Sequence, residues 1–306
     1  MEEVLKRILP QNVLAVCASL DYKKLFEIRL RAGRFASVNY GGKNYFLSPN
    51  GLCALEANAL KVCAKVVHDT VVRATDYSLY AVNDQLKNGY ITIKGGVRLG
   101  IAGEVVSECG VVKTIKNYSS VNIRIPHEVL GCSDTIYNKC FASGLNSTLI
   151  ISPPAAGKTT ILRDLARKLG GGSASYNVLL VDERSELSAQ YGGVSVLNVG
   201  ASTDIIANAP KSFAFSAGLR TLAPDVIITD ELMGESDAMA ASVATASGIA
   251  VVASVHGKDV SDIKSKNGLA SLVNRGTFTR FVEVSTKNGP GTIIAIKDGD
   301  LNLLWT

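Results

Sequence analysis

The chain has 306 residues, of which 47% are hydrophobic and 19% are charged, and its formal net charge is +5. This length predicts two domains, and this balance excludes an intrinsically disordered chain. The small positive excess permits binding to anionic lipid or nucleic acid but does not require it. No apolar run in the sequence approaches the roughly 18 residues of a membrane-spanning helix.

The first residues do not resemble a signal peptide. Two glutamates follow the first methionine and Pro10 comes early, so the basic start and the long apolar stretch are both missing. We therefore expect a cytoplasmic protein, which would dock on a membrane from the cytoplasmic side if it acts there. The cysteines lack C-x-x-C spacing and predict free thiols rather than a zinc site. They are Cys17, Cys53, Cys63, Cys109, Cys132 and Cys140.

The first part of the chain mixes helical and strand patterns. Residues 1–20 have apolar side chains at helical spacing, which predicts one amphipathic helix. The alternation in "FEIRLR" and the Gly41–Gly42 pair predict strands joined by a hairpin. Residues 54–88 predict helix again, and the glycine-punctuated β-formers of 89–125 predict a small sheet. We expect a smaller α+β N-terminal domain over residues 1–128.

The pattern changes after "PHEVLGCSD" (126–134), which we interpret as a linker. Continuous apolar runs then alternate with helical patterns at 159–169 and 235–247. Such runs indicate a mainly parallel sheet covered on both faces, as in α/β proteins. The last residues, with a turn at "KNGPG", predict antiparallel strands. The second domain is expected over residues 135–306.

The segment "SPPAAGKTT" follows an apolar strand and opens a helix, which is the context of a phosphate-binding loop. The helix N-terminus offers free N–H groups and a positive dipole end. Lys158 would reach the β- and γ-phosphates of ATP, and the Thr159 hydroxyl would bind Mg²⁺. A chance "GKT" at an ordinary helix start is the alternative, which the strand and helix disfavour. The expected nucleotide-binding residues are Ser152, Pro153, Pro154, Ala155, Ala156, Gly157, Lys158, Thr159 and Thr160.

This loop departs from G-x-x-x-x-G-K-[ST] at its first glycine, where Ser152 stands. Ala155 occupies a second position at which such loops often carry glycine. If that position requires a positive φ, alanine costs roughly 1 kcal/mol or more. The two prolines lack N–H groups but precede the amides that would bind phosphate. We expect a working but weakened site.

Two later apolar strands end in acid pairs, Asp182–Glu183 and Asp230–Glu231. In a phosphate-loop enzyme, one such carboxylate holds Mg²⁺ and a following glutamate polarises the attacking water. Either pair fits this role, and each alone also fits solvated charges at a strand end. His256 ends a further apolar strand, at the sheet edge where ligands bind, and is a candidate γ-phosphate sensor. A lone histidine is more often structural.

Seven segments together resemble the ATPases of type II and type IV secretion and pilus systems, and among them a sporulation-associated branch. They are "EIRLRAGR" (27–34), "GGVRLGIAGEV" (95–105), "SSVNIRIPHEV" (119–129), "IISPPAAGKTTILRDLAR" (150–167), "VLLVDERSEL" (178–187), "GLRTLAPDVIITDEL" (218–232) and "SGIAVVASVHG" (247–257). They span most of the chain. The resemblance implies a RecA-like P-loop ATPase domain at the C-terminal end.

The resemblance also assigns roles to the acidic residues. It implies that Glu231 is the catalytic glutamate and that Asp230 lies near Mg²⁺. Asp182 and Glu183 then match the family's Asp box, which organises water and metal, and His256 matches its His box. The implied metal residues are Thr159, Asp230 and Asp182.

The family further implies a ring, typically a hexamer, with ATP at subunit boundaries under the N-terminal domain. Arginines of that domain or of a neighbour would stabilise the γ-phosphate charge. Arg98 and Arg124 are the first candidates, and Arg29 and Arg31 come next. Each of them singly fits a surface salt bridge nearly as well.

We therefore expect a Mg²⁺-dependent ATPase that forms a ring motor in the mother-cell cytoplasm and acts on membrane proteins of a sporulation channel complex. One alternative is an ATP-dependent nucleic-acid motor or binder. Nucleic acid is disfavoured because the sequence has no cluster of basic residues interleaved with aromatics. The other alternative is a scaffold that binds nucleotide with little hydrolysis.

Overall fold

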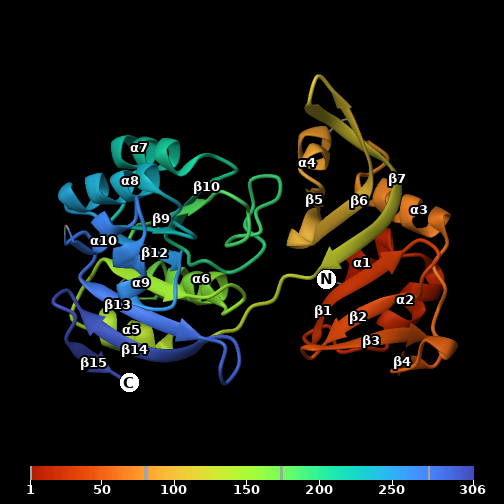
Figure 1. Cartoon of the computed structure of the whole chain (residues 1–306), viewed down its shortest axis with the longest axis horizontal. Helices are drawn as coiled ribbons and strands as arrows, with labels where there is room; N and C mark the ends of the chain where they lie inside the picture. The colour runs from red at the N-terminus through yellow and green to blue at the C-terminus, as the bar shows by residue number, and fades with distance from the viewer. Residues whose placement is uncertain (1, 79–81, 173–174, 275) are drawn as a thin grey trace. The chain divides into compact units, whose positions relative to one another are not determined.

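The computed structural model describes residues 2–78, 82–172, 175–274 and 276–306. Their contacts divide the chain into two compact units (Figure 1). Unit 1 comprises Met1–His127 and Tyr191–Val196, and unit 2 comprises Glu128–Gln190 and Leu197–Thr306. Each unit has its own sheet and core, and each is described by itself.

Unit 1 is built on a seven-stranded antiparallel sheet with the order β4-β3-β2-β1-β7-β6-β5. The strands are β1 (Leu25–Arg31), β2 (Ser37–Tyr40), β3 (Lys43–Ser48), β4 (Gly51–Cys53), β5 (Tyr90–Thr92), β6 (Arg98–Glu108) and β7 (Val111–Arg124). Gly41 and Gly42 both have positive φ in the β2–β3 turn, which confirms the predicted hairpin.

The two faces of this sheet differ in character because successive side chains of a strand point to opposite sides. Ile28 and Leu30 of β1 belong to the core, while Arg29 and Arg31 lie on the other face. Four helices cover the core side and contribute apolar residues such as Leu5 and Val67. They are α1 (Glu2–Ile8), α2 (Gln11–Cys17), α3 (Ala64–Ala74) and α4 (Asn83–Lys87).

Two predicted helices of this unit were wrong in extent. Residues 1–20 form two helices, because Pro10 lacks an N–H and disfavours helix at the residue before it. Residues 54–63 contain only a single 3₁₀ turn, Glu56–Asn58. The segment 60–62 instead exchanges backbone hydrogen bonds with residues 34–36, a non-local pairing that the helical spacing does not reveal. Residues 79–81 of the predicted helix lie outside the described residues.

Unit 2 contains an eight-stranded sheet with the order β10-β9-β11-β12-β8-β13-β14-β15. Its strands are β8 (Thr148–Ser152), β9 (Val178–Asp182), β10 (Thr203–Ala207), β11 (Val226–Thr229), β12 (Ala250–His256), β13 (Arg280–Ser285), β14 (Thr292–Asp298) and β15 (Leu303–Trp305). The first six strands in this order are parallel, and β14 and β15 are antiparallel. The predicted mainly parallel sheet with an antiparallel tail is confirmed.

Helices cover both faces of this sheet (Figure 1). α5 (Asp134–Cys140) and α6 (Lys158–Leu169) pack on one face, and α7 (Lys211–Thr221), α8 (Glu235–Ala246), α9 (Val260–Ser265) and α10 (Ala270–Asn274) pack on the other. Every residue of β8, β9 and β11 is therefore buried, as their continuous apolar sequences predict.

Two further expectations concern the whole chain. All six cysteines are free thiols, as predicted. Within the described ranges, no helix combines the length and the apolar character needed to cross a bilayer.

Candidate nucleotide-binding site

The parallel strands of unit 2 bring the predicted site residues to one sheet edge. Ser152 at the end of β8 is paired with His256 at the end of β12, and β11 ends just before Asp230. The carboxyl ends of neighbouring parallel strands lie together, and ligands of α/β sheets bind there. The loops that follow β8, β9, β11 and β12 therefore form one candidate site.

The predicted phosphate loop runs from the buried end of β8 into α6. Gly157 has a φ of 84° and Lys158 begins the helix, so the N–H groups of its first turn are free for a ligand. Ala155 has a φ of 58°, in the left-handed region. The loop therefore does require a positive φ at this position, and alanine is strained here by roughly 1 kcal/mol. Ala156, the next residue of the loop, is buried.

A glycine-containing turn from much later in the sequence supports this loop. The N–H of Gly291, between β13 and β14, donates to the carbonyl of Ala156 at 2.9 Å. A Cβ built on Gly157 would lie 3.3 Å from the nitrogen of Gly291, so glycine suits position 157 by space as well as by its positive φ.

Lys158 folds back over the loop. Its ammonium group donates to the carbonyl of Pro153 at 3.1 Å and lies 3.0 Å from Nδ1 of His256. Burial lowers the pKa of Lys158, and the charge of Glu231 opposes this effect. The lysine is thus held by the Pro153 carbonyl and the His256 imidazole in the place where a phosphate loop presents its cation.

Glu231 lies within a chain of polar and charged side chains. One carboxylate oxygen lies 2.8 Å from Nε2 of His256, and the other accepts a hydrogen bond from Arg184 at 3.2 Å. The Glu231 N–H donates to the hydroxyl of Ser254, and the residue has a φ of 33°. Lys158, His256, Glu231 and Arg184 therefore form one continuous line. Neither the glutamate nor the histidine is an isolated strand-end charge.

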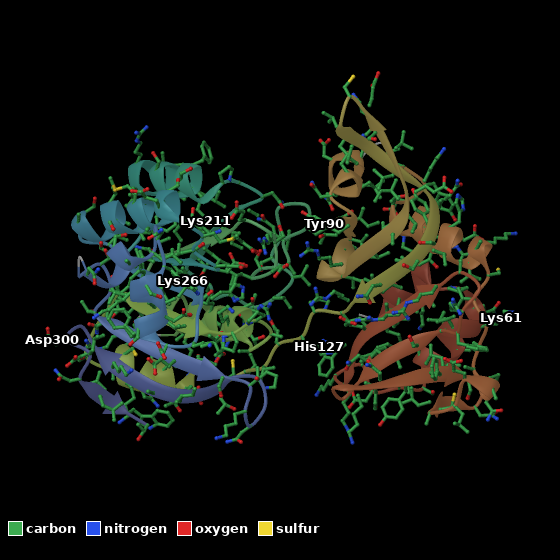
Figure 2. All side chains as sticks on the ribbon, in the orientation of Figure 1. Lys61, Tyr90, His127, Lys211, Lys266 and Asp300 are labelled. Carbon is green, nitrogen blue, oxygen red and sulfur yellow. The ribbon has the colours of Figure 1, made fainter. Side chains whose placement is uncertain are left out.

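The end of β12 is itself fixed. Lys266, labelled in Figure 2, donates to the carbonyl of His256 at 2.6 Å. The imidazole of His256 remains about two-fifths exposed, so it is open toward a ligand from one side.

Asp230 is buried, with only 6% of its surface exposed. Burial raises the pKa of Asp230 to about 6, while Lys211 acts in the opposite direction. Among the described residues, no hydrogen bond to its carboxylate is present. A buried carboxylate without such partners fits the oxygen ligands that Mg²⁺ prefers, as does the Thr159 hydroxyl in the first turn of α6.

Asp182 is fully buried and organises the loop after β9. Its two oxygens accept hydrogen bonds from the N–H groups of Glu186, Leu187 and Ser188 and from the Ser188 hydroxyl, at 2.6–3.0 Å. Both oxygens are therefore engaged with the protein. The metal-binding role that the resemblance implied for Asp182 stays a prediction, whereas its support of the loop is an observed arrangement.

Arg163 supports the same loop from the opposite side, and the sequence analysis missed it. From α6, Nε donates to the carbonyl of Leu187 at 2.6 Å and Nη2 donates to that of Glu186 at 2.7 Å. Burial lowers the pKa of Arg163, and the charge of Asp182 opposes this effect. The sequence did offer one signal for this role. Arg163 lies in a helix that packs on the sheet, and a buried arginine requires hydrogen-bond partners.

The remaining residues of the predicted set lie around these groups. Glu183 forms an ion pair with Lys211, which is 4% exposed and is labelled in Figure 2. The hydroxyl of Ser152 donates to the carbonyl of Pro153 at 3.0 Å. Thr159 and Thr160 are half-buried at the start of α6.

The candidate arginines belong to unit 1. Arg98 and Arg124 are direct neighbours across β6 and β7, and the Arg98 guanidinium lies 4.1 Å from the ring centroid of Tyr90, labelled in Figure 2. Glu27 accepts hydrogen bonds from Arg29 at 2.5 and 2.9 Å and lies 3.5 Å from Arg124. The structure gathers these arginines on one sheet face, and their role toward a γ-phosphate stays a prediction.

The fold and the loop define a class of protein. The chain has the fold of secretion and pilus ATPases, with a RecA-like P-loop domain preceded by a smaller domain, as predicted. The pilus retraction motor PilT with bound ADP matches 90% of this chain and 78% of its own, with a TM-score of 0.58 and 15% identity. The ATPase DotB of Yersinia pseudotuberculosis matches 97% of this chain and 79% of its own, with a TM-score of 0.58 and 16% identity.

The particular family follows from the sequence comparison. The model of the family "Sporulation stage III, protein AA" matches residues 2–302, and the chain belongs to this family. Stage III sporulation protein AA of Bacillus subtilis (strain 168) is 33% identical over 303 residues, which cover 97% of this chain and 95% of that protein.

Proposed function

We propose that this chain binds ATP and Mg²⁺ at the loop 152–160 and hydrolyses ATP. The observation that carries the proposal is the continuous line from Lys158 through His256 to Glu231, with contacts of 3.0 and 2.8 Å, at the end of a phosphate loop. These contacts support the proposal that Lys158 supplies a cation for phosphate and Glu231 a carboxylate for water.

The residues of the loop hold the nucleotide. The N–H groups of residues 156–159 surround the phosphates and Lys158 reaches the β- and γ-phosphates. Thr159 and Asp230 hold Mg²⁺, which neutralises charge on the phosphate oxygens when it is bound. Lys158 must leave His256 to make its contact, so nucleotide loading breaks the first link of the line.

The acidic residues then take separate roles. Glu231 orients the attacking water as a general base once its partners His256 and Arg184 rearrange. His256 senses the γ-phosphate because it contacts both Lys158 and Glu231. Asp182 and Glu183 hold the adjacent loop, through which they organise water and metal.

The family and the fold support a proposal about the assembly. We propose a homo-oligomeric ring, a hexamer, in which Arg98 and Arg124 stabilise the γ-phosphate charge. The ring acts in the cytoplasm of the mother cell and passes its domain motion to membrane proteins of a sporulation channel complex. PilT and DotB, whose fold this chain shares, are described as a motor and an ATPase.

The proposal is tested by two measurements on the full chain. Calorimetry with Mg-ATP should detect binding to wild type, a large loss with Lys158→Ala, and retained binding with Glu231→Gln. Phosphate release at concentrations that allow assembly should fall strongly in both variants. If wild type binds no Mg-ATP, or releases no more phosphate than the variants, the proposal is wrong.

A scaffold with little hydrolysis is the second candidate, and two observations favour it. Both oxygens of Glu231 are engaged by His256 and Arg184, and Ala155 strains the phosphate loop. Retained Mg-ATP binding by wild type, with phosphate release equal to that of Glu231→Gln, would select this alternative.

A gel shift with single-stranded DNA at varied salt tests the nucleic-acid alternative.

A further inference from the structure

We propose that unit 1 carries a second nucleotide site, distinct from the phosphate loop. It is a cavity of about 460 Å³ on the polar face of the seven-stranded sheet, which we call the arginine cavity. The residues that define it are Arg31, Arg34, Phe35, Asn44, Tyr45 and Phe46. Every residue that lines it belongs to unit 1, and none belongs to the loop 152–160.

The fold forms this cavity from neighbouring strands and one loop. Arg29 of β1 lies opposite Ser37 of β2, which lies opposite Phe46 of β3, so the three share one face. Arg31 follows two residues later on the same face. Gly33 has a φ of 74° and its N–H donates to the carbonyl of Val62, which fixes the turn that presents residues 34 and 35.

The cavity contains positive charge that the protein does not neutralise. Glu27, the partner of Arg29, also lies beside Arg124, so one carboxylate serves two arginines. Within the part of the chain that the structure describes, neither Arg31 nor Arg34 has a carboxylate partner, and Arg31 reaches only the Ser37 hydroxyl at 3.4 Å. Residues 1–127 hold 17 basic and 10 acidic residues, whereas residues 128–306 hold 15 and 17. Unpaired guanidinium groups in a concavity attract an anion.

The chemistry of the lining favours phosphate and a flat ring. A guanidinium group binds phosphate oxygens in pairs, which a lysine ammonium does not. Phe35 and Phe46, which both line the cavity, meet edge to face with ring centroids 6.4 Å apart. Such rings stack on nucleotide bases. The amide of Asn44 and the carboxylate of Glu56, which also line the cavity, suit a base edge and sugar hydroxyls.

The size of the cavity selects a compact ligand. Its volume falls within the range of small-molecule sites, roughly 300–1,000 Å³. An acidic peptide is less favoured, because an extended chain adds to a free strand edge, whereas these arginines lie on a sheet face. A free nucleotide and the terminal nucleotide of a single strand offer the same phosphate and base, and the experiment separates these two sources.

The first experiment uses the full chain with Lys158→Ala, so that the phosphate loop no longer contributes. Fluorescence anisotropy follows a ribose-labelled ATP analogue, a labelled oligothymidylate and a labelled polyglutamate peptide in separate titrations. We expect saturable ATP binding that Arg31→Ala with Arg34→Ala weakens about tenfold or more, through the loss of two charge-assisted contacts. Tighter binding of the oligothymidylate than of ATP would identify a strand as the source, and the reverse would identify a free nucleotide.

Two matched variants control this result. Lys65→Ala with Lys116→Ala removes the same charge from exposed positions that line another cavity of unit 1 and should leave binding unchanged. Arg31→Lys with Arg34→Lys keeps the charge but removes the paired N–H donors of the guanidinium groups. The nucleotide affinity of this variant should lie between those of the chain with both arginines and of the alanine pair. No saturable binding of either nucleotide probe, equal loss in the control pair, or preference for polyglutamate would overturn the proposal.

Photolabelling locates the site without relying on any cavity variant. The chain with Lys158→Ala is irradiated with an azido-adenine nucleotide and the labelled peptide is identified by mass spectrometry. Label on residues 29–46 supports the arginine cavity. Label confined to residues 152–160, or label on 29–46 that appears only when Lys158 is intact, would show that the nucleotide belongs to a phosphate loop instead.

Discussion

The ammonium group of Lys158 lies 3.0 Å from Nδ1 of His256, although 98 residues separate them in the chain. The contact joins the first residue of α6 to the last residue of β12. Because Nε2 of the same imidazole lies 2.8 Å from Glu231, one histidine connects the phosphate-binding cation to the proposed general base.

His256→Ala should therefore affect binding and turnover in opposite directions. Lys158 loses a competing partner, so the Kd for Mg-ATP should fall by about threefold to tenfold, the effect of one hydrogen bond to a charged group. Glu231 loses one of its two anchors, so kcat should fall about tenfold or more. Calorimetry and phosphate release measure the two effects. Weaker binding with unchanged kcat would contradict the proposed link.

Ala155→Gly should stabilise the protein. A φ of 58° strains alanine but not glycine, and the gain exceeds the extra entropy that glycine loses on folding by about 0.5 kcal/mol. Chemical denaturation should show a higher free energy of unfolding. Ala156→Gly, one residue along and without a positive φ, should instead destabilise. Equal effects of both variants would show that the backbone strain at 155 has no energetic consequence.

Arg163→Met should release the loop after β9 while leaving the phosphate loop in place. Two carbonyls lose their donors, which predicts a loss of about 2–3 kcal/mol in the free energy of unfolding. We expect kcat to fall while the KM for ATP changes only a few-fold. Arg167→Met is the control, since Arg167 pairs with Asp164 at 2.7 Å and is bonded to none of these carbonyls. An equal fall in kcat with the control would remove the special role of Arg163.

Asp230 predicts a pH dependence of the nucleotide-free protein. Its pKa rises from 3.8 to about 6 on folding, so the folded state binds the proton more tightly and the free energy of unfolding falls as pH increases from about 4 to 6. Above this window, ionised Asp230 costs of the order of 3 kcal/mol. Asp230→Asn should be more stable than wild type at pH 8 and similar to it at pH 4. Chemical denaturation at the two pH values without metal tests this, and a gain of equal size at both would contradict it.

Much of unit 2 was predictable because its strands carry long local signals. The fully buried strands β8, β9 and β11 appear as unbroken apolar runs, and α6 has a clear apolar face. The sequence analysis did not identify β10 or α7. β10 has only five residues, none of them fully buried and one of them an aspartate, so its apolar pattern is weak. In α7 the residue that packs against Leu179 is Gly218, which adds nothing to an apolar pattern.

The site was predictable in its members but not in its contacts. The sequence placed Lys158 at the start of a helix and Glu231 and His256 at strand ends, yet the line that joins them depends on the order of strands in the sheet. The position of Arg163 in a buried helix was a signal, but its partners could not be found, because a side chain that binds main-chain carbonyls leaves no matching residue type in the sequence. The arginine cavity was hidden for a similar reason. Phe46 of β3 and Arg29 of β1 come to lie on one sheet face only after β2 is paired between these two strands.

The bond from Gly291 to the carbonyl of Ala156 sets an order of events during biosynthesis. Gly291, in the turn that supports the phosphate loop, lies 135 residues after Ala156 in the sequence (291 − 156). A nascent chain on the ribosome makes the loop long before it makes that turn. The loop thus acquires this support only after the turn has been made, and truncations that remove the turn between β13 and β14 sever the support even though residues 152–160 are intact.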